Sequence, residues 1–140
     1  MLNEKVLILS AIEARKNSYT PYSKFKVGAA LLTKDGKVYQ GCNIECASYT
    51  PTTCAERTAL LKAVSEGHKE FSAIAVVGGP EEEIDVFSNY SAPCGVCRQY
   101  LREFCNPKEM KVIIAKSENE SKTFTLEELL PISFGPDNLK

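Results

Sequence analysis

Three cysteines in the chain have the spacing of metal ligands. Cys54 stands alone in Thr-Cys-Ala-Glu-Arg, whereas Cys94 and Cys97 form a Cys-x-x-Cys pair later in the chain. Sulfurs three residues apart in the first turn of a helix point to one side, and Pro93 favours a helix start at that place. Zinc prefers a tetrahedron of thiolates and imidazoles, and a catalytic zinc keeps one of its four positions for water. The three thiols therefore predict a catalytic site with one Zn²⁺ per subunit.

Glu56 and Arg57 follow the first cysteine and could supply the rest of the chemistry. Residues two apart on a regular helix point in nearly opposite directions, so Cys54 and Glu56 converge only if Cys54 lies at the irregular edge of the helix. A carboxylate in that place could take a proton from a zinc-bound water and deliver it to a leaving group. Arg57 could donate to the sulfurs and offset the negative charge of three thiolates on a divalent cation. Glu56 is therefore the predicted catalytic residue and Arg57 its supporting cation.

Length and charge narrow the class of protein. With 140 residues, 44% hydrophobic and 25% charged, the chain is expected to form a single domain over residues 1–140. Its 17 basic and 18 acidic residues give no basic surface for nucleic acid, so a small molecule is the better substrate class. No apolar run approaches the ~20 residues that span a bilayer, and the first ten residues do not resemble a signal peptide. We expect a cytoplasmic protein without membrane contact, in which a Cys-x-x-Cys pair binds metal and does not form a disulfide.

The hydrophobic pattern predicts alternating helices and strands. Helices are expected near residues 6–16, 54–66 and 94–104, and strands near 25–31, 38–44, 71–77 and 111–116, with a short strand or helical turn at 123–130. Residues 78–92 are expected to form a long acidic loop. This order predicts an α/β fold with a mixed sheet and helices on its faces.

Two motifs resemble one enzyme family. Cys-Ala-Glu-Arg at 54–57 followed by Pro-Cys-Gly-x-Cys-Arg-Gln at 93–99 resembles the cytidine deaminase family in its small, three-cysteine form. The resemblance runs from about Tyr19 to Leu139. It implies a three-layer α-β-α fold with about five strands, and zinc-dependent deamination of cytidine and 2′-deoxycytidine to the uridine nucleosides in pyrimidine salvage.

Other residues fit a nucleoside pocket. Asn43 and Glu45 lie two apart at a strand end, could hold sugar hydroxyls, and match the family's ribose-binding Asn-x-Glu. Phe25, in Phe-x-Val-Gly-Ala-Ala, resembles the family's pocket aromatic, on which a base can stack. Backbone groups of Ala55 and of the residues before Cys94 could bind the edge of the base.

The C-terminal segment also resembles the family. Residues 129–136 match a segment whose phenylalanine enters the pocket of a neighbouring subunit, and Phe134 is the matching position. The resemblance implies a homotetramer with shared active sites. Each of these side chains also has a plainer interpretation: Phe134 could anchor the terminus by packing, and Phe25 could belong to the core.

Several positions depart from the usual family pattern: Cys46, Thr50-Pro51, Gly78-Gly79 and Ile132. Proline at 51 pushes Thr50 toward an extended conformation, so the loop that carries Tyr49 beside the site is expected to differ in shape. These departures affect the predicted substrate preference more than the predicted chemistry.

Two alternatives remain open at the level of the sequence. Cys42 or Cys46 could close the three thiols into a structural zinc site, which would leave no position for water. A related deaminase, such as one acting on blasticidin S, shares the metal motifs, whereas the Phe25 and Asn43 segments favour a nucleoside enzyme. A deaminase that edits RNA or DNA is disfavoured by the acidic balance.

Overall fold

A mixed five-stranded sheet with the order β2-β1-β3-β4-β5 forms the centre of the fold. The structure is a computed structural model and describes residues 3–140. Along the chain the elements are α1 (Glu4–Arg15), β1 (Phe25–Thr33), β2 (Val38–Cys42), α2 (Ala55–Ser65), β3 (Phe71–Pro80), α3 (Gly95–Phe104), β4 (Lys111–Ser117), β5 (Glu120–Thr125), α4 (Leu126–Leu129) and a 3₁₀ helix η1 (Pro136–Leu139). Strands β3 and β4 are parallel, and the other neighbouring strands are antiparallel.

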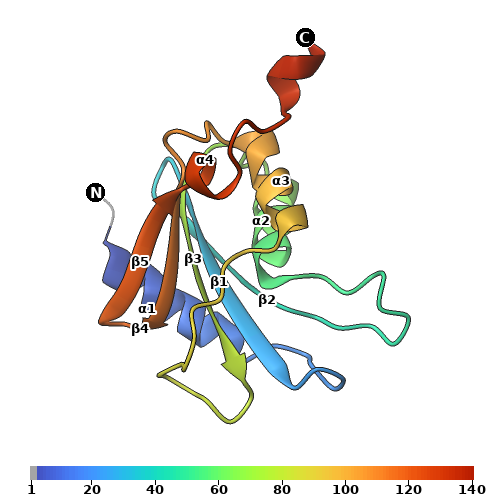
Figure 1. Ribbon diagram of the computed structural model, residues 1–140, viewed down its shortest axis with the longest axis vertical. Coiled ribbons are helices and arrows are strands. Elements are labelled where there is room, and N and C mark those ends of the chain that lie inside the picture. The colour runs from blue at the N-terminus through green and yellow to red at the C-terminus, as the bar shows by residue number, and fades with distance from the viewer. Residues whose placement is uncertain (1–2) are drawn as a thin grey trace.

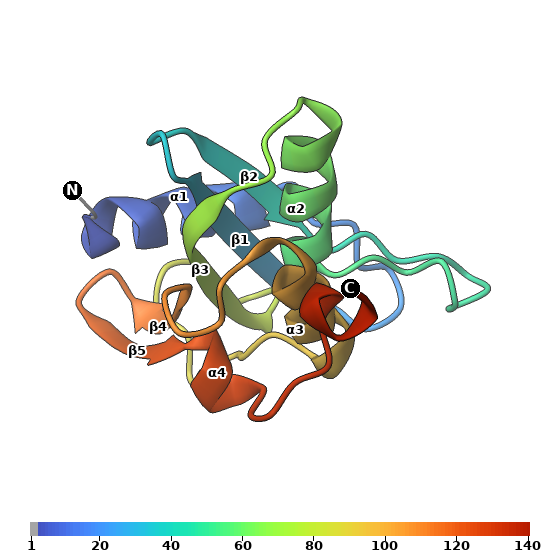
Figure 2. The same ribbon diagram turned by 90° about the horizontal axis from the view of Figure 1, so that it is seen from above.

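Helices cover both faces of this sheet. Helix α1 lies on one face, and α2 and α3 lie side by side on the other (Figures 1 and 2). Alternate residues of a strand face opposite sides, so Val76 of β3 packs with α2 and α3 while Val77 packs with α1. The expected three-layer α-β-α architecture is confirmed. Among residues 3–140, the helices are too short or too polar to cross a bilayer.

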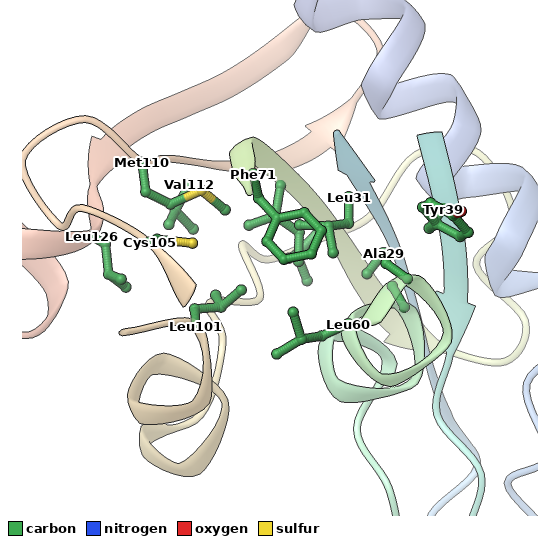
Figure 3. Packing of buried hydrophobic residues seen from close by; sticks show 14 of the residues in the cluster. Ala29, Leu31, Tyr39, Leu60, Phe71, Leu101, Cys105, Met110, Val112 and Leu126 are labelled. Atoms are coloured by element: carbon green, nitrogen blue, oxygen red, sulfur yellow. The ribbon is translucent and has the colours of Figure 1, made fainter. Parts of the chain in front are cut away.

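Apolar side chains from α2 and α3 meet the sheet in one core. Leu60 of α2 and Leu101 of α3 point toward Phe71 at the start of β3, and all three are almost completely buried (Figure 3). Gly41 of β2 lets α2 lie directly on the sheet, because a Cβ on this residue would come within 2.3 Å of the carbonyl oxygen of Ala55. This packing fixes the N-terminal ends of α2 and α3 near each other at one edge of the core.

The structure shifts the predicted ends of two strands and resolves one open assignment. Strand β3 continues through Gly78 and Gly79 to Pro80, because these residues still pair with β1, so the predicted loop begins only at Glu81. Strand β2 ends at Cys42, before the predicted end at 44. The segment 123–130 contains both predicted forms, since β5 ends at Thr125, whose side chain then caps α4.

Candidate active site

The three predicted thiol ligands converge. The Sγ atoms of Cys54 and Cys94 are 3.7 Å apart and those of Cys94 and Cys97 are 3.5 Å apart, and all three lie within 4.8 Å of one another. Sulfurs bound at 2.3 Å to a tetrahedral zinc ion are separated by about 3.8 Å. The spacing of the cluster therefore fits zinc without rearrangement of the chain.

The ends of two helices bring these sulfurs together. Cys54 is the N-cap of α2 and Cys94 the N-cap of α3, both in an extended conformation, and neither side chain caps its helix with a hydrogen bond. Each helix N-terminus carries about half a positive charge, which favours a thiolate at that place. Cys97, in the first turn of α3, is buried and completes the cluster.

Glu56 lies in the first turn of α2 with only 4% of its surface exposed. Because Cys54 precedes the helix in an extended conformation, the i to i+2 rule for a regular helix does not apply, and both residues line the same pocket. Burial raises the pKa of the Glu56 carboxyl to about 7, with a further contribution from the nearby Cys54 sulfur. The predicted convergence of thiol and carboxyl is present.

Arg57 holds the loop before α2 and contacts the sulfur cluster. Its Nη2 lies 3.6 Å from Cys54 Sγ and donates to the carbonyl oxygen of Thr52 at 3.2 Å. The pKa of the Cys54 thiol is lowered to about 5, first by hydrogen bonding from Cys97 and also by Arg57, whereas the pKa of Cys97 is raised by the same contact with Cys54. The cluster therefore favours a thiolate at Cys54 even before a metal neutralises it.

A pocket of about 290 Å³ opens beside the thiols and Glu56. Its lining includes three further residues that the sequence singled out: Phe25, Asn43 and Ala55. The side chain of Asn43 fixes the entrance, since its Oδ1 accepts from Val27 N at 2.9 Å and its Nδ2 donates to Phe25 O at 2.9 Å. The sequence therefore predicted a large part of one continuous pocket wall.

Glu45 and Tyr49 lie in a neighbouring hollow and not in this pocket. The Glu45 carboxylate accepts hydrogen bonds from the backbone amides of Tyr22 and Ser23 at 3.1 Å and from the Ser23 hydroxyl, which lowers its pKa. Tyr49 is 72% exposed in a left-handed conformation and packs edge-on against Tyr22. The hollow shares Thr52 with the pocket, so the two are adjacent.

Phe134 does not line the pocket of its own chain. It is 59% exposed, and its carbonyl oxygen accepts from Gln99 Nε2 of α3 at 2.9 Å. The segment that follows projects away from the body of the fold (Figure 1). A role for Phe134 in a pocket would therefore require a second copy of the chain.

The remaining cysteines do not join the metal cluster. Within residues 3–140, the only group of His, Cys, Asp and Glu atoms close enough to hold an ion consists of Cys54, Cys94 and Cys97. Cys46 lies against Ser48, and Cys42 lines a separate small cavity near Lys62. A closed structural zinc site with four cysteines is not supported by this geometry.

Sequence reasoning missed part of the lining: Val27, Thr52, Thr53 and Ser91. Val27 could have been found, because residues two apart on a strand share a face and Phe25 was already assigned to the pocket. For Ser91 the sequence indicated only that backbone groups of the residues before Cys94 could bind the base, because the position of its side chain depends on how residues 81–93 fold back onto β3.

Comparisons with known proteins identify the family of the chain. A family model described as the cytidine and deoxycytidylate deaminase zinc-binding region matches residues 1–115. The chain is 46% identical to a cytidine deaminase of Halalkalibacterium halodurans over 138 residues, covering 99% of this chain and 98% of that protein. The crystal structure of a cytidine deaminase from Burkholderia pseudomallei superposes with a TM-score of 0.84 at 44% identity, covering 95% of this chain and 100% of that one. A blasticidin-S deaminase of Bacillus cereus is 35% identical over 80% of this chain and 79% of its own length. With its three-thiol cluster and buried glutamate, this chain belongs to the zinc-binding cytidine and deoxycytidylate deaminase family.

Proposed function

We propose that this protein catalyses the hydrolytic deamination of cytidine and 2′-deoxycytidine to uridine and 2′-deoxyuridine, with release of ammonia, as a step of pyrimidine salvage. The observation that carries the proposal is the buried Glu56 carboxyl beside three convergent thiols in a pocket also lined by Phe25. The identity to curated cytidine deaminases over nearly the whole chain supports the substrate class.

Cys54, Cys94 and Cys97 are the proposed zinc ligands. When bound there, zinc would supply a Lewis acid that makes a water molecule acidic enough to act as a nucleophile near neutral pH. Arg57 would donate to Cys54 and balance the charge of the thiolates.

Glu56 is the proposed proton carrier. Water adds to C4 of the base and ammonia leaves, so one proton of the water must reach the ring nitrogen N3, where it stays in the product, and the other must reach the departing amine. A carboxyl in this pocket can accept each of these protons as general base and deliver it as general acid. Its burial limits competing exchange with bulk water.

The pocket wall would orient the nucleoside. Phe25 offers an aromatic face to the base, and the backbone of Ala55 lies at the pocket edge. Asn43 retains one amide hydrogen and one lone pair for a sugar hydroxyl beyond its two internal bonds. Glu45 and Tyr49 would approach the sugar from the adjacent hollow.

The proposed assembly is a homotetramer in which Phe134 of one subunit completes the pocket of another. Ile132 is fully exposed in a left-handed conformation that is costly for a β-branched residue, and Phe134 is more than half exposed beside it. Burial of these apolar side chains against a second copy would offset the cost. We also propose a cytoplasmic location, because free zinc-binding thiols need a reducing compartment.

A spectrophotometric assay against a substrate panel tests the activity. Purified protein is assayed with cytidine, 2′-deoxycytidine, adenosine, guanine and blasticidin S, and zinc per subunit is measured on the same sample. Turnover of the two cytosine nucleosides is expected. Turnover of blasticidin S alone would instead place the chain with its Bacillus cereus relative.

The substitution Glu56→Gln tests the proton carrier. The change preserves shape, so zinc content should stay near one per subunit while turnover falls by at least ~10²–10⁴-fold, the usual contribution of general acid–base catalysis. Glu109→Gln, on an exposed turn, is the matched control and should retain native activity. A Glu56→Gln enzyme with near-native turnover would contradict the assignment.

A further inference from the structure

Gly78 and Gly79, at the end of β3, have no side chains, and this leaves room for the segment 81–93 to pack against the strand. Successive strand residues face opposite sides, so Gly78 faces the same side as Val76 and the thiol cluster, and Gly79 faces α1. A Cβ on Gly78 would lie 2.7 Å from Ser91 Oγ and 3.0 Å from Ser91 Cβ. A Cβ on Gly79 would lie 2.6 Å from Glu83 Oε1. The glycine at 78 therefore permits the position that Ser91 occupies in the pocket wall.

Ser91 is held firmly from both sides. The preceding Tyr90 packs against the core, and its ring centroid lies 4.8 Å from Lys116 Nζ and 4.9 Å from Lys122 Nζ. Two residues after Ser91, the buried Pro93 has a carbonyl oxygen that accepts from Arg98 Nε at 2.8 Å. The hydroxyl at 91 is therefore placed by rigid neighbours and can contact a ligand at little entropic cost.

Among the side-chain hydroxyls that line the pocket, that of Ser91 has no hydrogen-bond partner within the described part of the chain. The Thr52 and Thr53 hydroxyls each bond a backbone group of their own loop, and both ends of the Asn43 amide are engaged. Across the described residues 3–140, Ser91 Oγ forms no hydrogen bond with a protein group, although Ser91 lines the pocket. A polar group fixed in a pocket wall without an internal partner is suited to a bond with the ligand.

Strand order indicates which part of a nucleoside would meet this hydroxyl. Val27 of β1 pairs with Gly78 on one side and bonds the side chain of Asn43 on the other. Neighbouring strands lie about 4.8 Å apart, so Asn43 and Ser91 occupy opposite walls. If Asn43 holds the sugar, Ser91 faces the base. Ser91 is also only three residues before Cys94, and both residues line the pocket in which the base must meet the thiol cluster.

We propose that Ser91 Oγ hydrogen-bonds the pyrimidine base near its amino-bearing edge, and that Gly78 is the positioning residue that allows this contact. The inference rests on the proposed deamination of cytosine nucleosides. It adds a side-chain contact to the backbone contacts expected from the residues before Cys94, and it gives the unusual Gly78-Gly79 pair a role.

Kinetics of Ser91→Ala provide the first test. Loss of one neutral hydrogen bond should lower kcat/KM by roughly 3- to 10-fold, equally for cytidine and 2′-deoxycytidine, because the sugar lies at the opposite wall. Ser88→Ala is the matched control, since its hydroxyl bonds Glu83 in the same segment outside the pocket. A change within about 1.5-fold for Ser91→Ala, or a loss confined to one of the two sugars, would overturn the proposal.

Gly78→Ala tests the positioning role. The added methyl group must displace Ser91, so kcat/KM should fall by a similar factor, and the loss in the double variant Gly78→Ala/Ser91→Ala should be smaller than the product of the two single losses, because the Ser91 contact can be lost only once. Additive losses would refute the role of Gly78. Thermal unfolding of each variant confirms that folded proteins are compared.

Calorimetric binding of uridine separates this inference from the proposed activity. Ser91→Ala should weaken uridine binding by roughly 3- to 10-fold, while Ser88→Ala leaves it unchanged. A native protein that converts cytidine, together with unaltered uridine affinity in Ser91→Ala, refutes the Ser91 contact alone. A native protein that binds uridine but converts no cytidine refutes the proposed activity, and the Ser91→Ala affinity still decides the contact.

Discussion

Arg57 provides a sharp test of how the thiol cluster is kept charged. Three thiolates on a divalent cation carry a formal charge of −1, and Arg57 Nη2 lies 3.6 Å from Cys54 Sγ. The guanidinium also bonds Thr52 O at 3.2 Å, so its position is fixed by the loop and not only by the sulfur. We expect Arg57→Gln to weaken zinc binding, because the shorter neutral side chain cannot replace both contacts.

The magnitude follows from the kind of hydrogen bond that the substitution removes. A hydrogen bond to a charged group contributes about 1.5–3 kcal/mol, which corresponds to a factor of about 10–150 in a dissociation constant. Removal of a residue that contacts a metal ligand without touching the metal usually lowers the metal affinity 10- to 100-fold, which corresponds to about 1.4–2.7 kcal/mol of binding free energy. We therefore expect Arg57→Gln to raise the zinc dissociation constant by about 10- to 100-fold.

The expected pH dependence has a definite sign. Arg57 is one of the groups that lower the pKa of Cys54, so its removal raises that pKa and lets protons compete with zinc at higher pH. The pH at which half of the zinc is lost should therefore move upward in Arg57→Gln. Competition with a chromogenic chelator over a range of pH measures both quantities.

Arg57→Lys is the matched control for this experiment. It keeps the positive charge but not the forked donor, so its affinity should lie between those of the native protein and Arg57→Gln. Equal zinc affinity and an unshifted pH of half-loss in Arg57→Gln would show that the helix ends alone compensate the thiolates.

Three further predictions concern stability and assembly. Gly28→Ala should lower the melting temperature by about 10 °C, because the new Cβ would lie 2.1 Å from Ala11 O and overpacking against backbone costs about 3 kcal/mol. Gly95→Ala is the control and should leave the melting temperature unchanged, because a Cβ at Gly95 meets open space. Removal of zinc with a chelator should abolish activity reversibly and, for zinc held at 100 times its dissociation constant, cost about 2.7 kcal/mol of stability by calorimetry. Phe134→Ala should lower kcat/KM by roughly tenfold or more and shift the sedimentation of the assembly without destabilising the subunit; native kinetics would contradict a shared pocket.

The metal cluster was predictable because its signals are local. Cys94 and Cys97 are close in the chain, and the need for a helix edge at Cys54 followed from the position of Glu56 alone. The structure meets that need by placing Cys54 as an extended N-cap. Thiols are rare enough that their spacing indicated a metal site before the fold was known, whereas the choice between a catalytic and a structural site needed Glu56 and the geometry.

The limits of strands and the outer pocket were less predictable because they depend on contacts between distant segments. Strand β2 stops at Cys42, since the next side chain, Asn43, turns to bond the backbone of β1. The same turn moves Glu45 into the adjacent hollow, although alternation along a continued strand would have placed it beside Asn43.

The register between β1 and β3 decides which side chain closes the pocket. Val27 pairs with Gly78, so Gly78 faces the thiols and leaves room for Ser91. Gly79 faces α1 and leaves room for Glu83. A shift of β3 by one residue would exchange the two faces, and the space that Ser91 occupies would then lie on the side of the sheet away from the thiols. Because a sequence of two glycines is the same in either register, only the paired strands reveal which glycine serves the site.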